Sequence, residues 1–229
     1  MNKKLSKRLS ACLNELSALS VIADIGTDHA YLPCQAVATG VIDKAIAIDV
    51  IDGPLAMAKQ TITDYGLTEK IELRKGSGLE SLKVGEVAGV CLAGMGGKLI
   101  SQLLLASLPV AKSMQKLTMQ PQGGELLLRK MLFENDFAII NEILLEEDGI
   151  IYTVMSATPQ TSRTYDVCDL MFGPILRQNV KDALFVKKWR NELVAIDRIL
   201  NKIPSSANQK QAFVQKKQLI EEVLLGVVS

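Results

Sequence analysis

Short apolar runs alternate with longer amphipathic stretches through the first two thirds of the chain. Each run is followed within two residues by glycine or a polar side chain. This pattern is typical of the buried strands of a parallel sheet that helices cover on both faces. Leucines recur at three- and four-residue steps over 5–16, which predicts a helix there. The predicted strands span 21–23, 44–48, 70–74, 87–92 and 116–119, and the helices between them span 55–65, 97–108 and 125–135.

Two further β-prone runs, 137–145 and 150–157, are joined by the sequence EEDG at 146–149. Asp-Gly between such runs predicts a tight hairpin. A parallel sheet closed by an antiparallel hairpin is typical of Rossmann-like class I methyltransferases, whereas a nicotinamide-dependent dehydrogenase more often continues with another parallel unit. The sequence therefore predicts an α/β fold of this class, with residues 1–160 as its first domain.

The pattern changes after residue 160, and residues 161–229 are predicted to form a C-terminal α-helical domain. The polar segment 158–163 contains Pro159 and indicates a linker. An apolar stripe with spacings of four, four, three and four then predicts a helix; it comprises Phe185, Trp189, Leu193, Ile196 and Leu200. A break near Pro204 precedes a second helix over 209–225, which gives an α-helical hairpin. We interpret the stripe as packing.

Charge is unevenly distributed between the two parts of the chain. Residues 1–176 carry 16 lysines and arginines against 20 aspartates and glutamates, a net charge of −4, and residues 177–229 carry 10 against 5, a net charge of +5. Basic side chains outside the apolar stripe are expected to face solvent, where phosphates can reach them: Lys187, Lys188, Arg190 and Arg198. A solvated surface without a partner explains the charge alone equally well.

The composition excludes several classes of protein. With 48% apolar residues, the 229-residue chain can build a packed core, and no apolar run approaches the roughly 20 residues that span a bilayer. The four cysteines are scattered and there is one histidine, so no metal site is expected, and reduced thiols indicate a cytoplasmic protein. The N-terminus lacks the apolar region of a secretory signal. No membrane association is predicted, and a monomer is favoured.

The turn after the first predicted strand, DIGTDHA at 24–30, is the first candidate ligand site. Gly26 would let the backbone approach a ligand closely. The later glycines of a pyrophosphate-binding loop are absent, and Asp28 stands at the position of the second one. A carboxylate such as Asp28 would repel a pyrophosphate, but it can accept hydrogen bonds from an ammonium-bearing ligand such as S-adenosylmethionine. Taken alone, the turn is equally consistent with aspartates that cap the following helix.

The ends of the next strands provide further candidates. Asp49 lies 25 residues after Asp24, near the roughly 20-residue offset at which an acidic residue binds ribose hydroxyls. The turn 76–78, Gly-Ser-Gly, follows the third strand, where an adenine would lie. The turn AGMGG at 93–97 has little side-chain bulk, so a planar base could lie against it, although a tight turn into the next helix explains its glycines more simply.

These motifs together resemble the TrmK family, bacterial methyltransferases that modify N1 of adenine 22 in tRNA. DIGTDHAYLP at 24–33 is similar to the family's DIGSDHAYLP motif, and AGMGG follows it in the same order. Further similar segments, which extend the resemblance over nearly the whole chain, are 45–47, 52–54, 120–121, 147–149, 172–174 and Trp189. The resemblance implies a Rossmann-like catalytic domain, a C-terminal helical pair similar to a short coiled coil, S-adenosylmethionine as cofactor and tRNA as partner.

Two positions differ from the family pattern. Asp49 stands where the family usually has Glu, which keeps the carboxylate one methylene shorter. Ser77 stands where the family usually has Asp in Gly-Asp-Gly. That Asp would accept a hydrogen bond from the adenine amino group of the cofactor. A serine hydroxyl can accept the same bond without a charge, which makes it weaker by roughly 1 kcal/mol. Weaker cofactor binding, without loss of activity, is the expected consequence.

The motifs and the resemblance together assign residues to three roles. The predicted cofactor site comprises Asp24, Gly26, Thr27, Asp28, His29, Asp49, Val50, Gly76, Ser77, Gly78, Ala93, Gly94 and Met95. The predicted tRNA contacts are Met95, Gly96, Gln120, Pro121, Lys187, Lys188, Arg190 and Arg198. Asp28 is the predicted catalytic side chain, because it could orient the adenine N6 group and offset the charge that N1-methylation creates. His29 is assigned to binding first, since N1 of neutral adenine carries a lone pair and needs no deprotonation.

Two other functions stay open at this point. The chain could be an RNA-binding module that keeps the fold without activity. An NAD-dependent oxidoreductase is disfavoured by the missing glycines and by the predicted hairpin.

Overall fold

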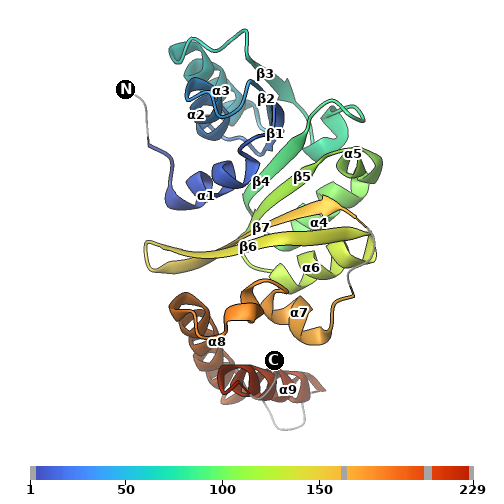
Figure 1. The fold of residues 1–229 in the computed structure, drawn as a ribbon. Helices are drawn as coiled ribbons and strands as arrows, with labels where there is room; N and C mark the ends of the chain where they lie inside the picture. The colour runs from blue at the N-terminus through green and yellow to red at the C-terminus, as the bar shows by residue number, and fades with distance from the viewer. Residues whose placement is uncertain (1–3, 161–163, 204–207, 227–229) are drawn as a thin grey trace.

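A computed structural model of the chain describes residues 4–160, 164–203 and 208–226. It has a central sheet with helices on both faces and two long helices beyond one edge (Figure 1). Within the described ranges, no helix combines the length and the apolar character that a membrane crossing requires. The predicted break near Pro204 and the end of the predicted linker, 161–163, lie outside these ranges.

The sheet has seven strands in the order β3-β2-β1-β4-β5-β7-β6. Strands β1 to β5 are parallel, and β7 pairs antiparallel with both β5 and β6. This confirms the predicted parallel sheet closed by an antiparallel hairpin. The strands are β1 (Val21–Ile25), β2 (Lys44–Asp49), β3 (Ile71–Lys75), β4 (Gly89–Met95), β5 (Lys116–Pro121), β6 (Phe137–Glu147) and β7 (Ile150–Pro159). The strand order reverses between β1 and β4, and open α/β sheets bind ligands at the carboxyl ends of strands at such a point.

The hairpin turn between β6 and β7 has the backbone that the sequence predicts. Its two central residues, Asp148 and Gly149, have φ angles of 51° and 78°. Positive φ at both positions is the geometry that matches the right-handed twist of the paired strands. Asp tolerates this conformation better than most side chains, and Gly adopts it without a steric penalty.

All the predicted helices form, in the predicted order, and shorter ones lie between them. They are α1 (Lys7–Leu16), α2 (Tyr31–Ala38), α3 (Asp52–Asp64), η1 (Gly78–Ser81), α4 (Gly97–Ala106), α5 (Leu108–Lys112), α6 (Glu125–Glu134), α7 (Val167–Phe172), η2 (Leu176–Asn179), α8 (Ala183–Leu200) and α9 (Asn208–Leu224). The predicted helix over 97–108 ends earlier, at Ala106, and a separate short helix begins at Leu108. Pro109 has no N–H to donate to the preceding turn, so α4 cannot continue through it.

Successive residues of the central strands pack on opposite faces of the sheet. Ile22 and Cys91 belong to a buried cluster with α1, α2 and α3. Ala23 and Leu92 belong to a second cluster with α4, α5 and α6. The strands are therefore covered on both sides, which explains why they read as continuous apolar runs.

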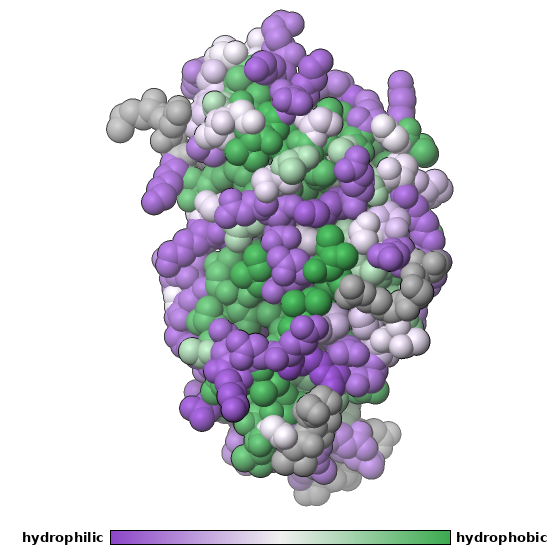
Figure 2. Space-filling model, viewed as in Figure 1, coloured by the Kyte–Doolittle hydropathy of each residue, from purple (hydrophilic) through white to green (hydrophobic). Residues whose placement is uncertain are grey.

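The two long C-terminal helices have their own apolar cluster. Phe185, Trp189 and Ile196 of the predicted stripe are buried in it with residues of α7 and α9. A buried ion pair, 2.7 Å between Arg129 Nε and Glu142 Oε1, joins α6 to β6 beneath α7. Figure 2 shows hydrophilic side chains gathered where the sheet layer meets the C-terminal helices, with apolar side chains above and below.

Candidate active site

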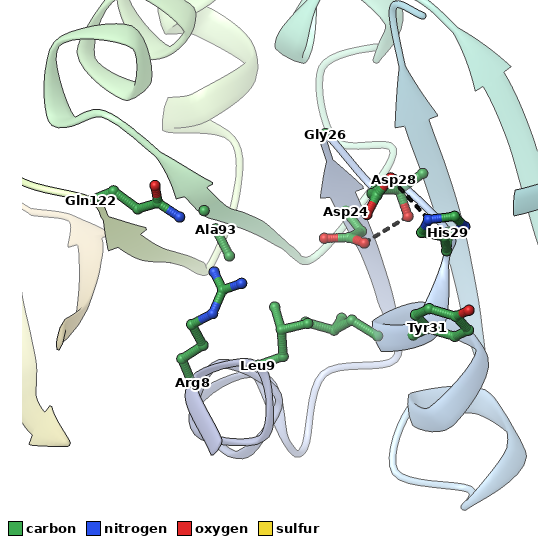
Figure 3. A pocket seen from close by; sticks show the side chains of 12 residues that line it. Arg8, Leu9, Asp24, Gly26, Asp28, His29, Tyr31, Ala93 and Gln122 are labelled. Carbon is green, nitrogen blue, oxygen red and sulfur yellow. Dashed lines mark hydrogen bonds and ion pairs between the residues drawn. The ribbon is translucent and has the colours of Figure 1, made fainter. Parts of the chain in front are cut away.

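A cavity of about 310 Å³ lies at the carboxyl ends of β1 and β4, at the reversal of strand order. Helix α1, the loop between β1 and α2, the end of β4 and the start of the loop after β5 form its walls (Figure 3). The residues that line it are Arg8, Leu9, Asp24, Gly26, Thr27, Asp28, His29, Tyr31, Leu32, Ala93, Gly94 and Gln122. The structure thus brings the predicted β1 loop and the predicted AGMGG turn to one cavity.

The β1 loop keeps a left-handed backbone at three positions although only one is glycine. The φ angles are 70° at Gly26, 53° at Asp28 and 55° at Ala30. Such angles are rare for side chains with a Cβ, and they occur preferentially at functional loops. Helix α2 begins at Tyr31, and its N-cap, Ala30, has no side-chain hydrogen bond. The alternative that the aspartates cap this helix is therefore wrong.

Asp24 is buried at the base of the cavity. Its Oδ2 atom accepts a hydrogen bond of 2.7 Å from Thr27 Oγ1. Burial raises the pKa of Asp24 to about 6, against the lowering effect of the Thr27 and Cys91 hydrogen bonds, and the nearby carboxylates of Asp49 and Asp28 raise it further. The cavity therefore holds closely spaced acidic groups, and a cationic ligand would relieve their repulsion.

Asp49 connects the ends of three strands beside the cavity rather than lining it. Its Oδ2 accepts the N–H of Asp28 at 3.2 Å, and its Oδ1 accepts the N–H of Ile51 at 3.0 Å. Its backbone oxygen accepts the N–H of Gly76 at 3.0 Å. The other predicted residues in this region, Val50 and Ser77, are exposed, while Gly78 is buried.

His29 presents an unusual imidazole at the cavity wall. Its ring stacks on Tyr31 with 5.4 Å between centroids, and its Nε2 atom lies 3.5 Å from Asp28 Oδ1. Its Nδ1 atom is buried and has no hydrogen-bond partner among the described residues. A buried nitrogen of this kind is costly unless a ligand satisfies it.

On the opposite wall, Gln120 holds the AGMGG turn instead of facing a substrate. Its Oε1 accepts the N–H of Gly94 at 3.1 Å and an Arg8 Nη1 hydrogen at 3.2 Å, and its Nε2 donates to the Pro121 oxygen at 3.0 Å. Gln120 is completely buried, and Pro121 is buried too. The prediction that these two residues contact tRNA does not fit, because their side chains are covered by the protein itself.

Gln122 is the residue of this loop that reaches the cavity. It is exposed, and its N–H donates to the Met95 oxygen at 3.0 Å. Met95 lies over the β1 loop, since its Cε atom would be 3.0 Å from a Cβ atom added at Gly26. Gly96 is exposed next to it.

Arg8 is the main site residue that the sequence did not predict. It comes from α1, and its guanidinium also lies 3.5 Å from Glu147 Oε2 and 5.7 Å from the centre of the Tyr152 ring. Its partner Gln120 is 112 positions away in the chain. The one available signal was its position off the leucine stripe of α1.

The basic side chains of α8 divide into two groups. Lys187 is half exposed and pairs with Glu146 at 2.6 Å, and Arg190 and Arg198 are exposed. Lys188 is different, because its side chain is only 20% exposed and its Nζ atom lies 2.7 Å from Glu125 Oε1. The expectation that all four face solvent is wrong for Lys188, since α8 packs this part of its polar side against the sheet domain.

Comparison with known proteins agrees with this geometry. The family described as tRNA (adenine(22)-N(1))-methyltransferase, TrmK, matches residues 22–224. A Bacillus subtilis tRNA (adenine(22)-N(1))-methyltransferase is 37% identical over 97% of this chain and 95% of its own.

Solved structures give the same result. The crystal structure of the B. subtilis M1A22 tRNA methyltransferase TrmK superposes with a TM-score of 0.89 at 35% identity, over 96% of this chain and 99% of that one. A Streptococcus pneumoniae protein, a candidate tRNA (m1A22) methyltransferase in complex with S-adenosyl-L-methionine, has a TM-score of 0.89 at 34% identity over 96% and 100%. The chain belongs to the TrmK family of tRNA (adenine(22)-N(1))-methyltransferases.

Proposed function

We propose that this protein transfers a methyl group from S-adenosylmethionine to N1 of adenine 22 in tRNA. The observation that carries the proposal is the cavity itself. It joins the β1 loop and the AGMGG turn, which carry the family motifs, at the strand-order reversal of a methyltransferase fold. The family membership supplies the reaction and its position.

The residues around the cavity fit this cofactor. Asp24 and Asp28 offer carboxylates to the ammonium and sulfonium charges, and the unpartnered Nδ1 atom of His29 can hydrogen-bond to the ligand. Arg8, on the opposite wall, offers a cation to the methionine carboxylate. Asp49 stands where ribose hydroxyls are bound in related folds. S-adenosylmethionine, when bound, supplies an electrophilic methyl group on a positively charged sulfur.

The remaining residues of the cofactor proposal surround these charged groups. Thr27 fixes the Asp24 carboxylate by its hydrogen bond, and Gly26, Ala93 and Gly94 leave space along the cavity wall. Val50 and the 76–78 turn would contact the adenine from the ends of β2 and β3.

The chain's contribution to the reaction is mainly positional. N1 of adenine has its lone pair available, so no residue has to remove a proton before transfer. Asp28, whose carboxylate is 69% exposed beside the cavity, would orient the N6 group and offset the positive charge that forms on the base. Met95, Gly96 and Gln122 would contact the target base once it is unstacked from the tRNA.

The exposed basic residues of α8, Lys187, Arg190 and Arg198, are proposed to bind tRNA phosphates. With tRNA as its substrate, the protein is assigned to the cytoplasm.

The test is methyl transfer from labelled S-adenosylmethionine to bulk tRNA, followed by digestion and identification of the modified nucleoside. We expect N1-methyladenosine. Cofactor binding without transfer would favour an inactive RNA-binding module, and absence of cofactor binding would contradict the proposal altogether. The Asp49→Ala variant, purified in the same way, controls for contaminating activity.

A further inference from the structure

One lysine of the C-terminal helices, Lys188, reaches into the sheet domain with most of its side chain covered. Lys188 Nζ, on α8, lies 2.7 Å from Glu125 Oε1 and donates to Thr153 Oγ1 at 2.7 Å. Thr153 Oγ1 also donates to Glu125 Oε1 at 3.4 Å, which closes a triangle of three polar side chains. Thr153 is completely buried in β7, and the lysine and glutamate side chains are only 20% and 22% exposed.

Glu125 is the first residue of α6, directly after the loop that leads from β5 to the cavity. Burial raises the pKa of Glu125, but the Lys188 charge and hydrogen bond outweigh this effect, so its pKa lies below the ordinary value. The glutamate is therefore ionised at the N-terminus of α6, where the helix dipole also favours a negative charge. Removal of Lys188 would leave that charge partly buried and unpaired.

The loop before Glu125 is bound to the AGMGG turn along its length. Gly97 N–H donates to the Gly123 oxygen at 2.9 Å, and Gln122 N–H donates to the Met95 oxygen at 3.0 Å. A Cβ atom added at Gly97 would lie 2.5 Å from the Gly124 oxygen, so the two segments are in direct backbone contact. A displacement of Glu125 is therefore transmitted to Met95 and Gln122, which face the target-base side of the site.

Neighbouring ion pairs of the helical pair do not have this connection. Lys187 pairs with Glu146, near the tip of the β6–β7 hairpin, and both side chains are more exposed. Lys217 pairs with Asp197 at 2.7 Å, between α9 and α8, so it stays within the helical pair. Lys188 alone among these three reaches the residue that begins α6.

We propose that Lys188 is a positioning residue, through which the C-terminal helices hold the 120–125 loop, and with it Met95 and Gln122, in the geometry for methyl transfer. The expected effect of Lys188 on methyl transfer rests on the proposed function, whereas its expected effect on the 120–125 loop does not. It assigns Lys188 to the reaction rather than to phosphate binding. Placement of reacting groups within about 1 Å is worth large factors in rate, so loosening this loop should reduce turnover.

The structural consequence is tested by hydrogen exchange in the absence of tRNA. In Lys188→Met, amides of the 120–127 segment should exchange about tenfold faster than in the parent, and Glu125→Gln should give the same change. Lys217→Met is the matched control, which should leave this segment unchanged. Unchanged exchange in both Lys188→Met and Glu125→Gln would overturn the proposal, whether or not the protein methylates tRNA.

The kinetic consequence is tested with tRNA and saturating cofactor. Lys188→Met should lower kcat about tenfold while KM for tRNA changes less than about twofold. The double variant with Glu125→Gln should be no worse than either single variant, because both remove the same interaction, and Lys188→Arg should recover part of kcat. If Lys188→Met does not fold, Lys188→Arg and Glu125→Gln are compared instead.

A raised KM with unchanged kcat and a flatter salt dependence would make Lys188 a phosphate ligand and overturn the proposal. A parent chain that binds cofactor but transfers no methyl group would contradict the proposed function, and the exchange result would then decide the inference by itself.

Discussion

The two charged regions of this protein differ in how they hold their charge. At the cavity, Asp24 and Asp49 are buried, and backbone N–H groups and a threonine hydroxyl fix their carboxylates. On the outer side of α8, Lys187, Arg190 and Arg198 are exposed. Buried, fixed charges act at short range and lose little to salt, whereas exposed charges are screened within roughly 10 Å.

This difference assigns the two regions different tasks. The cavity can bind a small cationic ligand in one defined orientation. Without a ligand, its closely spaced carboxylates lower the stability of the protein. The surface of α8 can attract a large polyanion without requiring one geometry. Lys188 combines features of both regions. It belongs to the basic helix, but its side chain is only 20% exposed and pairs with Glu125.

The largest effect is expected at Asp24. Its pKa of about 6 lies above the value of 3.8 for the group in the unfolded chain. The folded protein binds this proton more tightly, so the contribution to stability is present below about pH 4 and is lost as pH rises through about 6. Asp24→Asn should therefore gain up to about 3 kcal/mol in free energy of unfolding over the parent between about pH 4 and pH 7.

Urea denaturation without cofactor over this pH range measures the gain, which should come with weaker cofactor binding. Asp28→Asn, at an exposed carboxylate, should change stability by less than about 0.5 kcal/mol. A difference between Asp24→Asn and the parent that does not vary with pH would contradict the assignment.

Asp49→Ala should weaken S-adenosylmethionine binding by roughly 1.5–3 kcal/mol. The variant would lose the charged acceptor proposed for the ribose, and it also leaves the N–H groups of Asp28 and Ile51 without their side-chain partner. Isothermal calorimetry gives the affinity, and Asp49→Asn, which keeps one acceptor oxygen, should lose less. Unchanged affinity in the alanine variant would remove Asp49 from the site.

Asp28→Asn separates binding from chemistry within the cavity. If its charge acts on the forming cation, kcat with tRNA should fall roughly tenfold, about 1.4 kcal/mol, while cofactor affinity falls much less. Single-turnover rates and calorimetry on the same variant give both quantities. Equal losses would make Asp28 a cofactor ligand only.

The basic surface is tested by replacing Lys187, Arg190 and Arg198 together with Gln. Affinity for tRNA should fall, and the log–log slope of affinity against salt should flatten by roughly 2, since each phosphate contact contributes roughly 0.7–0.9. Cofactor affinity and thermal stability should not change. If the triple variant binds tRNA like the parent at every salt concentration, this surface only solubilises the protein, and Lys4 and Lys7 of the N-terminal region become the next candidates.

Ser77→Asp, which restores the usual family residue, is expected to have the smallest effect. Cofactor affinity should stay equal or improve by up to about 1 kcal/mol, because a carboxylate accepts a stronger hydrogen bond than a hydroxyl. A clear loss of affinity in calorimetry would show that the turn after β3 is arranged differently in this protein.

Local patterns predicted most of the fold. The strands of the sheet are visible as short apolar runs, the hairpin as Asp-Gly between two β-prone runs, and the stripe of α8 as a period of 3.6, all of which a sequence displays directly. The position of Asp49 beside the DIGTDHA loop was predicted in the same way, because strand ends meet at one edge of the sheet.

The placements that the sequence did not predict depend on contacts between distant segments. Arg8 reaches the cavity only because α1 packs beside β4 and β5. Lys188 is mostly covered because α8 lies against β6, which lets the lysine side chain reach Glu125 and Thr153. Gln120 and Gln122 are two positions apart, yet one is buried and the other exposed. That difference follows from the turn after β5, which no periodicity in the sequence specifies.

The most direct test of the account compares two tRNA transcripts that differ only at position 22. With adenine there, the protein and S-adenosylmethionine should give one N1-methyladenosine, which blocks reverse transcription at that nucleotide because the methyl group occupies the pairing edge. With guanine there, no methyl group should be transferred. Transfer to both transcripts at equal rates, or to a nucleotide other than adenine 22, would contradict the account.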